Sequence, residues 1–383
     1  MVSIQGNALI GSDLEFVEAL FIQVDENGII TELSTEKKSA DYVLPSSCVV
    51  VPGFINGHTH IADAFIKDQT YGLSLEEAVG SKGIKHSKLN SSLSNEKIQS
   101  MRNSLELLVK NGYTTFIDFR EEGKQGIKLL KDELRNFPIR GIILGRQNKN
   151  EKLSDIFEEA DGLGFSDVFS INDKLADEIK LLKESDSKKI VTIHASESME
   201  VISESLTLFG KPDIEKICDY SIFDFVVHAT YSNENDLHIL KKKNMHVICC
   251  PISNLYHGLK FPPINLILKN NVLLGLGTDN VFCCNPDPFR LMAFTLYSAR
   301  SNYQNLSPKE IIKSITVNLG NIIGRKIGQI REGYSGDLIA INLESPNTKY
   351  SKDVYTAITM RADSSDIVFQ MFKGEIVKWK DQK

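Results

Sequence analysis

The 383-residue sequence predicts an α/β fold, a (β/α)8 barrel of the TIM type with a small β-sandwich domain built from both chain termini. Eight runs rich in β-branched and aromatic residues alternate with helical patterns along the chain. Runs such as 190–193 and 225–227 are apolar throughout, which is typical of parallel strands that helices cover on both faces. Polar candidate residues follow several different runs, which favours a barrel over a doubly wound sheet with a single switch point.

The barrel strands are expected where the apolar runs lie. They cover residues 49–55, 113–119, 139–145, 167–171, 189–194, 223–228, 245–252 and 272–279. Apolar residues at helical spacing over 98–108 and 175–182 predict two of the crossover helices. Proline directly after Ser307, with Glu310 three residues after that serine, predicts the start of a helix that runs to 319–320.

The two flanks of the barrel show a different pattern. Short β-rich runs separated by tight turns occur at 8–10, 19–24, 28–33, 337–342, 367–373 and 375–379. One flank alone has too few strands to bury a face, whereas the pooled strands can form a small sandwich. The expected domains are therefore the barrel over 51–328 and a β domain that combines 1–50 with 329–383.

The composition excludes several classes of protein. Lys and Arg number 44 against 50 Asp and Glu, a net charge of −6, so no overall basic field would attract a nucleic-acid polymer or anionic lipid. No window supplies eighteen uninterrupted apolar residues, and the first residues lack a basic segment followed by an apolar one. The six cysteines form no C-x-x-C motif, which favours reduced thiols. These features predict a cytoplasmic protein that does not associate with membranes.

The first chemical signal is a pair of histidines at the end of the first predicted strand. His58 and His60 are two residues apart, so the alternation of a strand directs both imidazoles to one side, where they could hold one metal ion. In a chain with 8 histidines such a pair also arises by chance, so the pair alone is a weak motif.

Further polar residues follow the fifth, sixth and eighth predicted strands. His194 ends the fifth strand and can supply a third metal ligand, while Glu197 is placed three residues later to move a proton. His228 ends the sixth strand and Asp279 the eighth, where a buried polar side chain is costly unless it faces the barrel mouth. A solvated loop glutamate and a turn aspartate are the alternatives, but the agreement of four strand ends favours a common site.

Together these motifs resemble the amidohydrolase superfamily. The similarity involves 52–60, 194–197, His228 and 277–279, and it extends through 316–339 into the second flank. Within the superfamily, the pattern resembles the branch that contains cytosine deaminase, guanine deaminase, S-adenosylhomocysteine deaminase and the triazine hydrolases. The resemblance spans nearly the whole chain.

The resemblance implies a metal site and a reaction. It places one divalent metal ion, zinc or alternatively iron or manganese, on His58, His60, His194 and Asp279. It implies three catalytic groups: Glu197 as the proton shuttle, His228 as the group that orients and helps deprotonate the attacking water, and Asp279. The expected reaction is the hydrolytic release of ammonia from an aminated nitrogen heterocycle, such as a pyrimidine, a purine or a pterin-like ring. A homo-oligomer is also implied.

Three alternatives remain open from the sequence. The same site could expel chloride or hydrolyse a cyclic amide, and a protein of this fold could also be a non-catalytic scaffold. A dinuclear site would need a lysine at the end of the fourth strand. Lys174 comes only after that predicted strand has ended, so a single metal ion is expected unless the strand lies in another register.

Substrate contacts are expected after the second, third and seventh strands, on the catalytic face of the barrel. Arg120, Gln147 and Asn254 lie at these places, as does Arg146 directly before Gln147, and Asn254 resembles an asparagine of the deaminase branch. Asp63 and the pair 67–68 replace the apolar residues and the arginine often found there in adenosine-type deaminases. This departure disfavours a nucleoside substrate.

Overall fold

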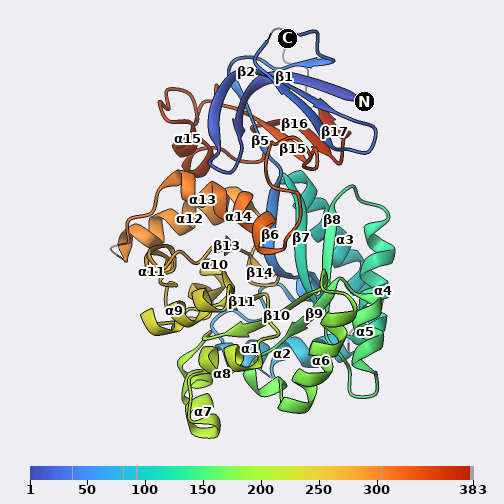
Figure 1. Ribbon diagram of the computed structural model, residues 1–383, viewed down its shortest axis with the longest axis vertical. Coiled ribbons are helices and arrows are strands. Elements are labelled where there is room, and N and C mark those ends of the chain that lie inside the picture. Colours follow the sequence, from blue (N-terminus) through green and yellow to red (C-terminus); the bar gives the residue numbers. More distant parts are fainter. Residues whose placement is uncertain (37, 81, 92–93, 303, 380–383) are drawn as a thin grey trace.

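Two β-sheets organise the chain. The computed structural model describes residues 1–36, 38–80, 82–91, 94–302 and 304–379. In Figure 1 a sheet built from both ends of the sequence lies at one end of the molecule, and a second sheet surrounded by helices lies beneath it. The second sheet carries all the candidate site residues.

The second sheet is parallel and follows the chain in order. Each pair of neighbouring strands runs in the same direction, in the order β13-β12-β11-β10-β9-β8-β7-β6-β14. The strands are β6 (Phe54–His60), β7 (Tyr113–Arg120), β8 (Arg140–Gly145), β9 (Gly162–Phe165), β10 (Ile190–Ala195), β11 (Phe225–His228), β12 (His246–Cys249), β13 (Leu274–Leu276) and β14 (Asp279–Asn280). Because all strands are parallel, their carboxyl ends meet at one face of the sheet.

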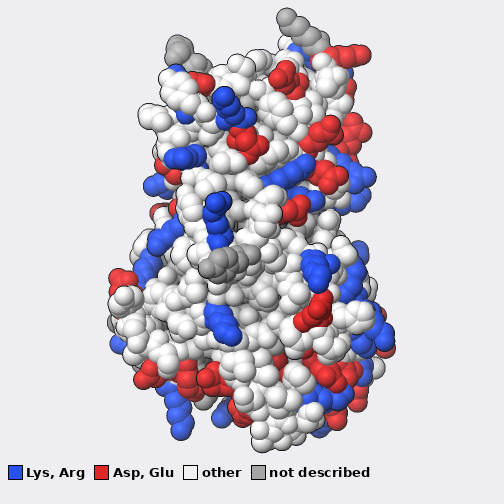
Figure 2. Space-filling model, turned by 90° about the vertical axis from the view of Figure 1, so that its left-hand side faces the viewer, with Lys and Arg blue, Asp and Glu red and all other residues white. Residues whose placement is uncertain are grey.

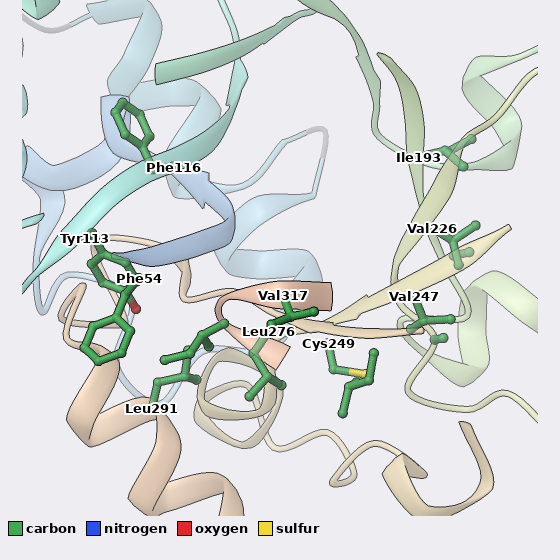
Figure 3. Close-up of a cluster of buried hydrophobic side chains, with 14 of the residues drawn as sticks. Phe54, Tyr113, Phe116, Ile193, Val226, Val247, Cys249, Leu276, Leu291 and Val317 are labelled. Carbon is green, nitrogen blue, oxygen red and sulfur yellow. The ribbon is translucent and has the colours of Figure 1, made fainter. Parts of the chain in front are cut away.

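Helices connect successive strands and cover the sheet. They include α3 (Ser94–Lys110), α4 (Gly123–Leu134), α5 (Leu153–Glu159), α6 (Asp173–Ser185), α7 (Met199–Phe209), α8 (Asp213–Tyr220), α9 (Glu234–Lys242), α10 (Pro251–Tyr256), α11 (Ile264–Lys269) and α12 (Pro288–Ser301). In Figure 3, Ile193, Val226 and Val247 follow one another on adjacent strands, and all three belong to the buried core beneath these helices. Phe54 lies beside Tyr113 in the same core and packs edge-on against Phe289 of α12. Fully apolar strands are the expected result of this double covering.

The last predicted strand returns to the first strand of the parallel sheet. β13 ends at Leu276, and β14, which begins at Asp279, pairs with the first strand β6. The predicted eighth strand 272–279 is therefore divided into two pieces. Between them, Gly277 approaches His58 so closely that a Cβ atom would lie 2.6 Å from the backbone nitrogen of His58. A glycine at this point lets the last strand reach the first, and the sheet curls.

The terminal sheet joins the two ends of the sequence, as predicted. Its order is β17-β16-β15-β5-β1-β2-β3, with β4 beside β1. The strands are β1 (Val2–Ile10), β2 (Glu15–Val24), β3 (Ile30–Ser34), β4 (Tyr42–Val43), β5 (Cys48–Pro52), β15 (Leu338–Asn342), β16 (Ile367–Phe372) and β17 (Glu375–Trp379). Tyr42, Phe369 and Trp379 contact one another with ring centroids 5.4 to 5.9 Å apart. Strands from both chain ends therefore share one small core.

The predicted first barrel strand, 49–55, is divided between the two sheets. β5 pairs with β15 and β1 in the terminal sheet, whereas β6 opens the parallel sheet. The break falls at Gly53, where a Cβ atom would lie 2.2 Å from Cγ2 of Thr114. The close approach of Thr114 explains why the chain turns at a glycine here.

The prediction of the fourth strand was wrong. The strand is β9, and part of the predicted run 167–171 forms the 3₁₀ helix η2 (Val168–Ser170), which Asp167 caps. β9 contains Gly162 and Gly164, and glycine-rich segments have low strand propensity. The structure requires both glycines, because a Cβ would lie 1.9 Å from the Ile190 carbonyl oxygen at the first and 2.7 Å from the Phe119 ring at the second.

The predicted helix that begins after Ser307 is interrupted. The Ser307 hydroxyl accepts a hydrogen bond from the Glu310 amide at 3.1 Å, which confirms the start of α13 (Pro308–Ser314). The helix does not continue to 319–320 without a break, because α14 (Val317–Ile322) is separate. The carbonyl oxygen of Ile315 instead accepts a hydrogen bond from the Ile55 amide of β6 at 2.7 Å. The helix is therefore interrupted where it meets β6.

The surface and the helix lengths agree with the charge and hydropathy pattern of the sequence. On the face shown in Figure 2, lysine and arginine are intermixed with aspartate and glutamate. Within the described ranges, no helix is both long enough and apolar enough to cross a bilayer.

Candidate active site

Four side chains that could bind a metal ion meet at the carboxyl ends of the strands. His58 and His60 lie on β6, His194 on β10 and Asp279 on β14. His58 Nε2 is 3.2 Å from His194 Nε2 and 3.3 Å from Asp279 Oδ1, and His60 Nε2 is 3.6 Å from the same oxygen. The three histidines each offer a ring nitrogen within 4.8 Å of the other two, and all four side chains are buried. This arrangement forms a compact cluster of three nitrogen donors and one oxygen donor.

The protonation states of this cluster suit a divalent cation. Burial lowers the pKa of His58 and of His194, and it lowers that of His60 to about 3, so the imidazoles are neutral. Burial acts to raise the pKa of Asp279, but its hydrogen bond with His58 holds it well below its ordinary value. Three neutral nitrogens and an ionised carboxylate form a ligand set that zinc and related ions accept. The cluster can therefore hold a divalent metal ion.

The polypeptide backbone is strained at the strand ends that carry this cluster. The φ angle is +74° at His228, +65° at Asp279 and +46° at Ser196. Left-handed conformations of this kind cost about 1–3 kcal/mol each in residues other than glycine, and they concentrate at functional sites. Side-chain contacts fix the strained strand end at Asp279, where the Ser253 hydroxyl donates to Oδ2 at 2.6 Å.

His228 and Glu197 lie beside the cluster as a second pair of titratable groups. His228 Nε2 is 3.5 Å from Glu197 Oε1. On the other side of the ring, His228 Nδ1 is 3.0 Å from Asn254 Oδ1, and the Asn254 amide group donates to Thr230 Oγ1 at 2.6 Å. With its oxygen thus directed at the ring, Asn254 requires Nδ1 to carry a proton. Burial raises the pKa of Glu197, which suits a group that donates a proton.

Contacts behind the cluster orient its imidazoles. His194 Nδ1 is 2.9 Å from the Phe165 carbonyl oxygen, and His60 Nδ1 is 2.8 Å from Glu121 Oε1. The ring of Phe119 lies edge-on against His58, with ring centroids 4.4 Å apart. A hydrogen bond at Nδ1 leaves Nε2 as the atom that can bind a metal ion, so these partners select the nitrogen that faces the centre.

A buried lysine approaches the same centre from a helix that covers it. Lys85 of α2 (Ile84–Ser91) lies with Nζ 2.7 Å from Glu121 Oε1 and 3.6 Å from Asp63 Oδ2. Burial acts to raise the pKa of Glu121, but Lys85 and His60 hold it well below its ordinary value. Burial raises the pKa of Asp63 to about 7 despite the opposing influence of Lys85. Asp63 also accepts from the Asn280 side chain at 2.7 Å.

A cavity of about 160 Å³ opens onto the cluster. Its wall includes His60, His194, Glu197, His228 and Asp279. The short helix α1 (Leu75–Val79) and α2 close another side of the cavity, and in Figure 1 they lie beyond the carboxyl ends of the strands, on the side away from the terminal sheet. The cavity therefore exposes three of the four candidate ligands and both proton-transfer groups to a single small molecule.

Three of the expected substrate contacts, Arg120, Gln147 and Asn254, lie outside the wall of this cavity. Arg120 is fully buried, its guanidinium Nε lies behind α4 near Gly126, and its Nη2 donates to Glu122 at 2.7 Å. Gln147 is exposed and donates to the Glu151 carbonyl oxygen. None of the three lines the cavity in the described structure. Asn254 stands on α10 behind His228 and contacts its ring, whereas Arg120 and Gln147 contact Glu122 and Glu151.

Arg146, the other expected contact, follows β8 and lines the cavity. His86 and Lys85 of α2 line it as well. The fourth strand ends at Phe165, and Lys174 comes nine residues later, in α6, where its side chain is exposed. It therefore lies away from the cluster.

No local motif marks Lys85 or Glu121. In the sequence, each of them is only a charged residue in a polar connection. Such residues are common at a protein surface, so neither could be predicted to lie at the site.

The sequence matches known proteins over most of its length. The model of the Amidohydrolase family matches residues 49–377. An uncharacterised protein of Methanocaldococcus jannaschii is 32% identical over 364 residues, which cover 91% of this chain and 93% of that protein. A 5-methylthioadenosine/S-adenosylhomocysteine deaminase of Thermococcus onnurineus is 27% identical, covering 97% of this chain and 92% of that enzyme.

Solved structures share the fold. An adenosine deaminase from Xanthomonas campestris with bound zinc superposes with a TM-score of 0.86 and 16% identity, covering 100% of this chain and 94% of that one. Atrazine chlorohydrolase from Arthrobacter aurescens in complex with zinc gives a TM-score of 0.83 and 16% identity, covering 99% and 95%. The resemblance seen in the sequence motifs is confirmed, and the chain belongs to the amidohydrolase family.

Proposed function

We propose that this protein is a metal-dependent hydrolytic deaminase that releases ammonia from an aminated nitrogen heterocycle. The observation that carries the proposal is the shared cavity, whose wall combines three members of the candidate metal cluster, His60, His194 and Asp279, with Glu197 and His228. Relatives named as deaminases over more than nine-tenths of the chain support the reaction class.

The residues of the site have separate roles in the proposed reaction. His58, His60, His194 and Asp279 would hold the cation, which when bound supplies Lewis acidity and lowers the pKa of water towards about 7. His228, whose Nδ1 proton is engaged by Asn254, has Nε2 available to accept a proton from the attacking water. Glu197 donates a proton to the ring nitrogen next to the amine-bearing carbon, so that this carbon accepts the water oxygen. The amine then takes the proton that His228 accepted and leaves as ammonia, while the remaining hydrogen of the water oxygen passes to Glu197 and the ring carbon becomes a carbonyl.

We propose zinc as the cation. The set of three nitrogens and one carboxylate supports this choice, as does the zinc in structures that share the fold. The exposed position of Lys174 supports a single ion.

The sheet memberships support the proposed architecture, a closed (β/α)8 barrel over 51–328 beside a β-sandwich made from 1–50 and 329–383. The pairing of β14 with β6 supports the closure, with β13 and β14 as two parts of the eighth strand. Strand β5 extends the first terminal segment to Pro52. A cytoplasmic location is supported by the six cysteines, which all lie in the described part of the chain and are free.

The proposal is tested by measuring ammonia release from zinc-quantified protein on a panel of aminated pyrimidines, purines, nucleosides, pterins and triazines. We expect turnover on at least one ring class, with no turnover after removal of the metal by a chelator. Chloride release from a chlorinated triazine, or ring opening of a cyclic amide, without any ammonia release would replace the deaminase proposal. Protein that binds no metal ion from zinc-supplemented medium would instead indicate a non-catalytic scaffold.

A further inference from the structure

The buried lysine of α2 connects two acidic side chains that have no other strong cationic partner. The Lys85 side chain is 4% exposed, and its ammonium contacts Glu121 at 2.7 Å and Asp63 at 3.6 Å. In the parts of the chain that the structure describes, it is the only lysine or arginine within 4.0 Å of either carboxylate. Buried charges are costly unless they are paired, so Lys85 and the two carboxyl groups that it contacts stabilise one another.

One branch of this set ends at a candidate metal ligand. The oxygen of Glu121 that accepts from Lys85 also lies 2.8 Å from His60 Nδ1, while His60 Nε2 faces Asp279 at 3.6 Å. A carboxylate at Nδ1 fixes the tautomer and the ring orientation of a metal-binding histidine and makes its other nitrogen a better donor. Lys85 holds that carboxylate in place.

The other branch ends beside a second candidate ligand. Asp63 accepts from the Asn280 side chain at 2.7 Å and from the Phe282 backbone amide at 3.2 Å. Asn280 directly follows Asp279 in β14, so the position of Asp63 bears on the position of that strand end. The two carboxylates that Lys85 contacts therefore anchor the surroundings of ligands from both β6 and β14.

We propose that Lys85 is a positioning residue of the metal centre, which sets the affinity of the site for its cation by holding Glu121 against His60 and Asp63 against β14. Because Lys85 belongs to α2, which lines the cavity, its contacts also join this helix to the groups around the candidate ligands. The inference rests on the proposed metal centre, but it concerns the strength of metal binding and not the identity of the substrate.

The test is the zinc affinity of Lys85→Met, measured on metal-free protein by competition with a chromophoric chelator. Loss of a partner that orients a metal ligand typically costs about 10- to 100-fold in metal affinity, and we expect a loss in this range. Lys97→Met is the matched control. Lys97 of α3 is also a buried lysine, with Nζ 2.5 Å from Glu122, but this pair contacts none of the candidate ligands in the described structure.

Unchanged zinc affinity in Lys85→Met, or an equal loss in Lys97→Met, would overturn the inference. If Lys85→Met does not fold, the double variant Lys85→Met, Glu121→Gln replaces it, because removal of both charges leaves no unpaired carboxylate at position 121. At least a tenfold loss is expected there as well, and wild-type affinity would overturn the inference. Failure of the wild-type protein to bind zinc would instead refute the proposed function, so the two failures are distinguishable.

Discussion

Asn254 holds the ring of His228 by its Nδ1 atom, at a distance of 3.0 Å, on the side opposite to Glu197. Asn254 is itself fixed by the donation of its amide group to Thr230, so its oxygen is the atom that meets the imidazole. The contact therefore determines both the plane of the ring and the nitrogen that remains free to accept a proton.

Removal of this contact should impair turnover without removal of the metal. We expect Asn254→Ala to lower kcat by about 10- to 100-fold, because His228 loses its fixed orientation. Thr230→Val is the control, since it removes the outer hydroxyl and leaves the bond to His228 in place, and its effect should be smaller. Steady-state ammonia release and zinc content measure both variants, and wild-type kcat in Asn254→Ala would show that other contacts orient the ring.

The proton-shuttle role of Glu197 predicts a separation of metal binding from catalysis. Glu197→Gln keeps the shape of the side chain but removes its acidic proton, so kcat should fall by about 10²- to 10⁴-fold. Zinc content should equal that of the wild type, because Glu197 lies outside the cluster of ligands. Glu200→Gln, an exposed change in the first turn of α7, should retain activity. Retention of activity in Glu197→Gln would exclude the shuttle.

The close approach of the last strand to the first predicts that Gly277 tolerates no side chain. In Gly277→Ala the new Cβ would lie 2.6 Å from the His58 backbone nitrogen and 2.8 Å from its Cβ, so β6 must shift. We expect a stability loss of about 1–3 kcal/mol, together with a loss of bound zinc. Gly141→Ala is the control, because its new Cβ would meet the flexible end of Leu134 at 2.6 Å and the ring of Phe116 at 3.2 Å, and neither of these residues belongs to the cluster of candidate ligands. Thermal unfolding and metal analysis measure the result, and full zinc content in Gly277→Ala would contradict it.

The buried carboxyl group of Asp118 predicts a pH-dependent stability. Asp118 Oδ1 accepts from Thr59 Oγ1 at 3.0 Å and from the Ile61 amide at 2.8 Å, whereas Oδ2 lacks a hydrogen-bond partner in the described structure. Burial raises the pKa of Asp118 from 3.8 to about 6. The folded state thus binds this proton more tightly, and the resulting stabilisation is complete below about pH 4 and is lost as the pH rises through about 6.

Asp118→Asn should remove this pH dependence. The difference between 3.8 and about 6 corresponds to about 3 kcal/mol, which sets the upper limit of the effect. The free energy of unfolding of the variant, relative to the wild type, should therefore increase between about pH 4 and pH 7. Urea unfolding of both metal-free proteins across this range measures the difference, and a difference that stays constant with pH would contradict the prediction.

The strand ends were predictable from the sequence because each one combines an apolar run with a polar residue. His194 and His228 follow runs whose periodicity leaves little choice of structure, and their side chains do meet in the structure, with stacked rings 5.3 Å apart. The fourth strand was not predictable in this way, because its glycines are required by contacts with Phe119 and Ile190 that only the folded chain brings near.

The contacts around the cluster were harder to predict from the sequence than the cluster itself. Lys85 lies in a polar connection and meets Glu121 only because α2 folds back over the strand ends. Arg120 was expected at the cavity because it lies at the end of a strand. Its side chain instead turns towards α4. Which way a side chain turns at the last residue of a strand depends on packing that no local pattern encodes.

The order of strands in the terminal sheet determines when this sheet can form during translation. During synthesis, β5 leaves the ribosome long before its neighbour β15, which begins at Leu338, so one edge of β5 stays unpaired until most of the chain has been translated. Only the turn at Gly53 separates β5 from β6, the strand that carries His58 and His60. His58 and His60 therefore leave the ribosome directly after β5, long before β15 completes the sheet beside it. Nascent chains that stall before β15 would expose an open strand edge that is prone to aggregation.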